Sequence, residues 1–385
     1  MTNDLFSGDA GDVTHPWRRA KRTLGEAAFS AIDAALLTGA RVDRLARALP
    51  GRRVLVTGVY RPDSLLSRAL PRLSSNQHDV TFAFGAVTTA EEALVQHTVA
   101  EGLSGGKFEN LNAVLAAAGR PSGPAGSSGG PTANPSGPTA SPSGRPTASP
   151  SGPTASPSGP TASPSARGGV PSGSSAPAGA PSSSAREPGR PPAAASESGD
   201  APPTTPAHDF DWILVVDDDL LLPPRFLDRF IALCERFALD MAQPAQTLRS
   251  HSAWRVTRRR PASLVRETRF VEIGPLTAFA RCAAAELLPF PELRFGWGLD
   301  LHWAAVAADS GWRLGVVDAT PVRHESATVG SAYPRTDAEA EAADFLSSRP
   351  YLPASRANEV IAVHRRAGTT RAAAGAPAPE RRPRR

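Results

Sequence analysis

Three consecutive carboxylates, Asp217, Asp218 and Asp219, are the residues of this sequence whose type and spacing most clearly suggest chemistry. They follow five apolar residues, Trp212–Val216, which predict one strand buried on both faces. Because side chains alternate along a strand, Asp217 and Asp219 can point one way and Asp218 the other. Two such carboxylates at the edge of a sheet can hold a divalent cation on a phosphate. A helix cap before Pro223 is an equal alternative, and the triplet alone leaves both interpretations open.

Two later segments carry further candidate groups. In Phe295-Gly-Trp-Gly-Leu-Asp300, the glycines on both sides of Trp297 permit close approach of the backbone to a ligand, and Asp300 starts a predicted helix. The simpler interpretation of Asp300 is a first-turn carboxylate stabilised by the helix dipole. Further along, the apolar stretch Gly315-Val-Val ends in polar groups and His324 follows it. A lone histidine of this kind is more often structural than a metal ligand.

Two other stretches give weaker evidence of contacts with a ligand. Lys107 and Asn112 stand in Gly105-Gly-Lys-Phe-Glu-Asn-Leu-Asn112, which opens a predicted helix, and both could reach a phosphate or a ribose. A solvated surface explains them equally well. The Gly274-Pro275 break in Val271–Thr277 could let the backbone face a sugar.

The elements that would position these groups alternate along the chain. Strands that alternate with helices predict an α/β fold with a parallel sheet. Before the triplet, the predicted elements are strands at 53–60 and 78–84 and helices at 89–101 and 107–118. After it they are a helix at 223–237, a helix at 298–308 and a last strand at 313–317.

A long low-complexity stretch interrupts this alternation. It contains heptapeptides Pro-Thr-Ala-Ser-Pro-Ser-Gly that begin at Pro138, Pro146 and Pro153. Such a composition buries too little apolar surface to offset the entropy of ordering, so a disordered insert is expected. The expected organisation is a disordered tail (1–16), an N-terminal helical segment (17–50), a nucleotide-binding half (51–118), the insert (119–207), a metal and acceptor half (208–366) and a disordered basic tail (367–385).

The motifs together resemble a nucleotide-sugar glycosyltransferase of the GT-A fold. The similarity is closest from Asp211 to Gly330, where Trp-Ile-Leu-Val-Val-Asp-Asp-Asp, Phe-Val-Glu-Ile-Gly-Pro-Leu, Gly-Trp-Gly-Leu-Asp and Gly-Val-Val-Asp-Ala-Thr-Pro-Val-Arg-His are similar to a family of uncharacterised plant and bacterial glycosyltransferases. Residues 53–118 resemble family 2-like transferases more weakly. The resemblance implies a single Rossmann-like GT-A domain, with a mostly parallel sheet and helices on both faces, interrupted by the insert.

The resemblance also implies roles for individual residues. Asp217 and Asp219 would match the DXD motif and hold Mn²⁺ or Mg²⁺ on the nucleotide diphosphate, and His324 would complete the metal shell. Asp300 would match the base that deprotonates the acceptor hydroxyl in an inverting enzyme. The donor would contact Val59, Tyr60, Arg61, Lys107, Asn112 and Asp218, and the acceptor would contact Trp297 and Gly298.

Two departures from the family leave other functions open. Phe82-Ala-Phe-Gly stands where family 2 enzymes carry an acidic residue, and the Gln-X-X-Arg-Trp motif of processive synthases is missing. A single transfer is therefore expected rather than polymerisation, to an acceptor that is a glycan, a lipid-linked molecule or a small molecule. The alternatives are another metal-phosphate enzyme, such as a nucleotidyltransferase, and a catalytically degenerate carbohydrate-binding or scaffold protein.

The charge and the apolar runs of the sequence limit which partners and which cellular location are expected. The 385-residue chain has a net charge of +5, but no basic-aromatic pattern typical of nucleic-acid binding accompanies it. No apolar run is long enough to span a bilayer, and the first residues lack a signal-peptide core, so a cytoplasmic protein is expected. Residues 18–36 mix basic and apolar positions at helical spacing. A helix packed on the domain is the favoured interpretation, and peripheral contact with a membrane surface is the alternative.

Overall fold

The computed structural model describes residues 16–119, 209–250, 252–325 and 333–366. The predicted disordered tails and the predicted insert lie outside these ranges, apart from residues 16 and 119. Within them, no helix is both long and apolar enough to cross a membrane.

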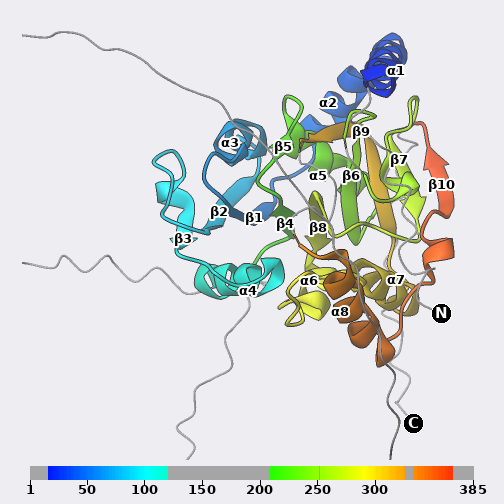
Figure 1. Cartoon of the computed structure of the whole chain (residues 1–385). Coiled ribbons are helices and arrows are strands. Elements are labelled where there is room, and N and C mark those ends of the chain that lie inside the picture. The colour runs from blue at the N-terminus through cyan, green and yellow to red at the C-terminus, as the bar shows by residue number, and fades with distance from the viewer. Residues whose placement is uncertain (1–15, 120–208, 251, 326–332, 367–385) are drawn as a thin grey trace, which may run out of the picture. The chain divides into compact units, whose positions relative to one another are not determined.

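Ten strands of the described part form one mixed sheet, which confirms the predicted α/β class (Figure 1). The strands are β1 (Arg53–Tyr60), β2 (Asp79–Ala86), β3 (Thr98–Ala100), β4 (Trp212–Val216), β5 (Leu220–Leu221), β6 (Met241–Gln246), β7 (Val265–Thr268), β8 (Leu276–Ala280), β9 (Leu314–His324) and β10 (Val360–His364). Their order is β10-β7-β9-β6-β8-β4-β1-β2-β3, and β5 pairs with β9.

Strands from both sides of residues 120–208 join in this sheet. β1 and β4 pair in parallel, with Val54 opposite Trp212 and Thr57 opposite Val215. β1, β2 and β3 continue the parallel arrangement to one edge. On the other side of β4 the directions mix, because β8 runs antiparallel to both β4 and β6 while β6 and β9 are parallel. The chain therefore returns to the same sheet after residues 120–208.

Alternation along β4 gives the sheet two apolar faces, as a strand buried on both sides requires. Ile213 and Val215 join one buried cluster, and Trp212, Leu214 and Val216 join the other. Helices lie on both faces of the sheet (Figure 1). The first is covered by α4 (Lys107–Ala118), α6 (Arg281–Leu287), α7 (Leu299–Ser310) and α8 (Arg335–Ser347), and the second by α2 (Thr38–Ala48), α3 (Leu66–Leu73) and α5 (Phe226–Arg236). An N-terminal helix, α1 (Pro16–Ala35), precedes α2.

Two predicted elements differ from the structure. The helix expected at 89–101 is replaced by a short 3-10 turn (Val95–His97) and by β3, because residues 98–100 pair with the end of β2. The last strand was expected to end at 317, but β9 continues to His324 because its second half pairs with β5 and with the end of β6. In both cases pairing with distant strands overrides the local pattern.

Candidate metal and acid–base site

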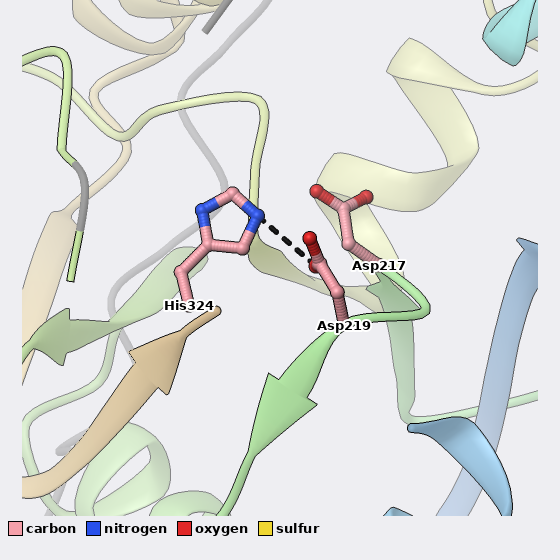
Figure 2. Close-up of side chains that lie close together, drawn as sticks. All are labelled: Asp217, Asp219 and His324. Carbon is pink, nitrogen blue, oxygen red and sulfur yellow. Dashed lines mark ion pairs between the residues drawn. The ribbon is translucent and has the colours of Figure 1, made fainter. Parts of the chain in front are cut away.

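The three carboxylates lie in the turn between β4 and β5, and they separate as the alternation predicts. The Asp218 carboxylate is buried and accepts hydrogen bonds from the backbone N–H of Arg61 at 2.9 Å and from its guanidinium at 3.0 Å. Asp219 points toward His324, and the carboxylate of Asp217 lies beside that of Asp219 (Figure 2). The backbone of Asp217 is fixed by a 2.9 Å hydrogen bond from its N–H to the carbonyl of Pro275.

Asp217, Asp219 and His324 form a cluster whose ligand atoms all lie within 4.8 Å of one another. Strand pairing brings the histidine there, because Leu220 of β5 lies opposite His324 of β9. The N–H of His324 also donates to the hydroxyl of Ser250 at 3.1 Å. The cluster is therefore held by the backbone of two paired strands rather than by its side chains alone.

Each carboxylate of the cluster has a cationic neighbour. Lys107 Nζ lies 2.6 Å from Asp217 Oδ1, and His324 Nε2 lies 3.0 Å from Asp219 Oδ1. Burial alone would lower the pKa of both groups, but the hydrogen bonds and charges of these carboxylates outweigh it. The pKa of Lys107 and the pKa of His324 are both raised above their usual values.

The residue types and spacing of the cluster fit a divalent cation. Atoms that lie about 2.0–2.6 Å from one ion are at most about 5 Å apart, which the 4.8 Å span of the cluster satisfies. Carboxylate oxygens suit both Mg²⁺ and Mn²⁺, and the imidazole of His324 favours Mn²⁺. All three side chains are about one-fifth exposed or less, so they are accessible without being freely solvated.

Asp300 lies in the first turn of α7 and is buried. Burial raises the pKa of its carboxyl to about 7, although backbone hydrogen bonds, including one from Ile273, act in the opposite direction. The N–H of Leu301 donates to Asp300 Oδ1 at 2.9 Å. A carboxyl group that titrates near neutral pH can both accept and release a proton in that range.

Glu272 is a second buried carboxylate that the sequence analysis did not single out. Burial, followed by the charge of Asp300, raises the pKa of Glu272 to about 8. Gln246 Nε2 donates to its carboxylate at 3.0 Å, and the side chain of Gln243 accepts from its backbone N–H. The available signal was an acid inside the apolar stretch Phe270-Val-Glu-Ile.

The segment 272–275 connects the two carboxyl groups to the cluster. A Cβ atom added at Gly274 would lie 2.9 Å from Asp217 Oδ2, and Ile273 donates to Asp300. The Gly-Pro break that was expected to face a sugar therefore lies directly against Asp217. Residues 272–275 therefore link Glu272 and Asp300 to the cluster of Asp217, Asp219 and His324.

Of the residues predicted to contact the nucleotide-sugar donor, some are buried in the core and others are exposed near the cluster. Tyr60 is buried, and its hydroxyl lies 2.8 Å from that of Thr98, so its side chain offers no surface to a ligand. Val59 packs against the apolar core. Arg61, by contrast, lies beside the cluster through Asp218, and 61% of its side chain is exposed.

The side chain of Asn112 is hydrogen-bonded to the backbone of Phe290 and does not face the site. Its amide donates to the carbonyl of Phe290 at 2.8 Å and accepts from the N–H of the same residue at 2.8 Å. These two hydrogen bonds hold the loop before α7. They account for Asn112 without any contact to a nucleotide-sugar donor.

The glycines around Trp297 are required by packing. Added Cβ atoms would lie 1.9 Å from the ring of Phe108 at Gly296 and 3.0 Å from Leu346 at Gly298, and both glycines have positive φ. Gly298 is buried between helices, so close approach of protein side chains, rather than of an acceptor, accounts for it. Trp297 remains partly exposed, with its indole N–H 3.0 Å from the hydroxyl of Tyr333.

Comparisons of the chain with protein-family models and with curated proteins found no match.

Proposed function

We propose that this protein is a metal-dependent glycosyltransferase of the GT-A fold that moves a sugar from a nucleotide-sugar donor to an acceptor hydroxyl. The observation that carries the proposal is the convergence of Asp217, Asp219 and His324 at the carboxyl end of β4. The buried Asp300 is linked to them through Ile273 and Gly274. In parallel α/β sheets, ligands bind at this end of the strands. The resemblance of the motifs around these residues to glycosyltransferases supports the same assignment.

In this proposal the cluster binds the diphosphate end of the donor. Asp217, Asp219 and His324 hold Mn²⁺ or Mg²⁺, which when bound neutralises the charge that develops on the departing nucleoside diphosphate. Lys107 adds a second positive charge next to Asp217, and the exposed guanidinium of Arg61 extends the cationic surface toward the donor.

The acceptor end of the reaction is assigned to Asp300. The acceptor oxygen forms a bond to the anomeric carbon while the bond from that carbon to the diphosphate breaks, and the acceptor proton passes to the Asp300 carboxylate. A pKa of about 7 suits this role, because the group is partly ionised at neutral pH and still basic enough to take the proton. Glu272, whose pKa is about 8, still holds its proton when Asp300 ionises, and the charge of Asp300 then raises the pKa of Glu272.

The test is a screen of nucleotide sugars with and without Mn²⁺, read by thermal shift and by release of the nucleotide product. The expected result is a Mn²⁺-dependent shift with one donor and release of its nucleoside diphosphate. The double variant Asp217→Asn, Asp219→Asn should lose both signals, whereas Asp309→Asn, an exposed acid on α7, should keep both.

Other products of the screen would contradict the proposal. In a parallel assay with nucleoside triphosphates in place of nucleotide sugars, release of pyrophosphate would identify a nucleotidyltransferase instead. The absence of any Mn²⁺-dependent shift, or equal activity of the double variant, would favour the scaffold alternative.

A further inference from the structure

Helix α1 is attached to the rest of the protein by one side, chiefly through the carboxylates of that side. The guanidinium of Arg259, which is buried, pairs with Glu26 and lies 2.5 Å from Asp33 Oδ2. Glu26 also accepts from the backbone N–H of Leu248 at 2.9 Å, and Asp33 accepts from that of Ala262 at 3.1 Å. The residues of α1 that lose exposure recur at helical spacing on this one side: Arg22, Gly25, Glu26, Phe29 and Asp33.

The opposite side of α1 is apolar and faces outward. Trp17 and Leu24 are both 72% exposed, and Ile32 is 42% exposed. Exposed alanines at 27, 28, 31 and 35 lie on the same face. We call these seven residues the outer face of α1. An amphipathic helix of a globular domain normally buries its apolar stripe, whereas here most apolar residues of α1 face outward and Phe29 lies on the domain side. The sequence analysis favoured packing on the domain, which the structure confirms, but the packing relies on the ion pairs of Glu26 and Asp33.

The exposed apolar surface continues into the turn that follows α1. Leu36 and Leu37 are 41% and 63% exposed, respectively. Of the large apolar side chains that stand exposed in the described residues, five of eleven therefore belong to residues 17–37. Such a concentration marks an interaction surface rather than scattered exposure.

Basic residues gather at the first turns of the same helix. The sequence Trp17-Arg-Arg-Ala-Lys-Arg22 holds four of them in six positions, and the first turn contains no acid. Arg19 and Lys21 are exposed. A helix with basic residues, a tryptophan and an outward apolar stripe is suited to the boundary between anionic headgroups and acyl chains. An apolar protein partner would match the stripe but not the basic end.

We propose that the outer face of α1 docks the protein on a lipid surface that contains anionic lipids. The Arg259 pairs hold the helix against the domain while the apolar stripe enters the headgroup region and the exposed Arg19 and Lys21 meet lipid charge. Leu248, whose N–H donates to Glu26, follows Thr247, and the N–H of Thr247 donates to the carbonyl of Val322, two residues before His324.

The experiment is co-sedimentation of the full chain with vesicles of phosphatidylcholine, with and without phosphatidylserine, at low and high salt. The wild type should pellet with the phosphatidylserine vesicles and less so at high salt. Leu24→Glu removes apolar burial and adds repulsion, so its affinity should fall about tenfold or more. Val95→Glu is the matched control, because Val95 is an apolar residue outside α1 that is 58% exposed, and its binding should equal that of the wild type.

Three outcomes would overturn the proposal. Equal sedimentation of wild type and Leu24→Glu would show that the outer face is not involved. Absence of the wild type from every vesicle pellet would exclude the lipid surface. Concentration-dependent self-association that Leu24→Glu abolishes, without vesicle binding, would assign the face to a second copy of the chain. Thermal unfolding of each variant confirms that an exposed substitution has left the fold intact.

Discussion

Replacement of Asp300 by asparagine should stabilise the protein at neutral and higher pH. In the folded protein the carboxyl group keeps its proton up to about pH 7, against an ordinary value of 3.8. Folding therefore becomes less favourable as pH rises between these two values, because the unfolded state ionises first. At about 1.4 kcal/mol per pKa unit, the total penalty in the wild type approaches about 4 kcal/mol.

Asparagine has nearly the same shape and can still accept the hydrogen bond from Leu301, but it has no charge to desolvate. Of the total penalty, about 2.5 kcal/mol falls between about pH 5 and about pH 8. The unfolding free energy of Asp300→Asn should therefore rise by this amount relative to that of the wild type over the same range. Because the charge of Asp300 also acts on Glu272, the measured value describes the pair.

Urea unfolding of both proteins at several pH values, in the presence of a chelator, measures the difference directly. Asp309→Asn on the exposed end of α7 is the control, and its stability relative to wild type should not vary with pH over this range. A pH-independent difference between wild type and Asp300→Asn would refute the reasoning, since it would mean that Asp300 titrates at its ordinary value. A stabilised variant that has lost transfer activity would indicate that the buried charge is kept for function.

Two further substitutions test the contact of Gly274 with Asp217 and the buried ion pair of Asp318 with Arg266. Gly274→Ala should weaken Mn²⁺ binding, measured by calorimetry, because the added Cβ would lie 2.9 Å from Asp217 Oδ2. Its thermal stability should change little. Unchanged affinity for Mn²⁺ would show that Asp217 does not bind the ion. Asp318→Ala should cost about 3–5 kcal/mol in urea unfolding, because it leaves the buried Arg266 without the carboxylate that now lies 2.8 Å from it. Glu339→Ala, in an exposed pair with Arg335, should cost less than about 1 kcal/mol, and a similar loss in both variants would contradict the role of burial.

The sequence was sufficient to predict the strand at the centre of the site and the separation of its carboxylates. Five apolar residues followed by three acids can be buried on both faces of a sheet, and alternation then sends Asp218 away from its neighbours. The meeting of Asp217 and Asp219 with His324 follows from strands that end at one edge of the sheet. Their role in cation binding stays a prediction.

The roles of Asn112 and Glu272 depend on contacts between residues that are far apart in the chain. Asn112 looked available for a ligand until Phe290, 178 residues away, was found to occupy both ends of its amide. Glu272 gained its significance only because the fold buries it beside Asp300. Neither fact is encoded in local spacing.

The orientation of α1 likewise depends partly on the sequence and partly on tertiary contacts. Helical periodicity fixed which residues share a side, so the sequence determined that an apolar stripe exists. It did not determine which side would face the domain, because apolar burial and ion pairing favoured opposite choices. Arg259, more than two hundred residues away, supplies the partner for Glu26 and Asp33, and that tertiary contact turns the stripe outward.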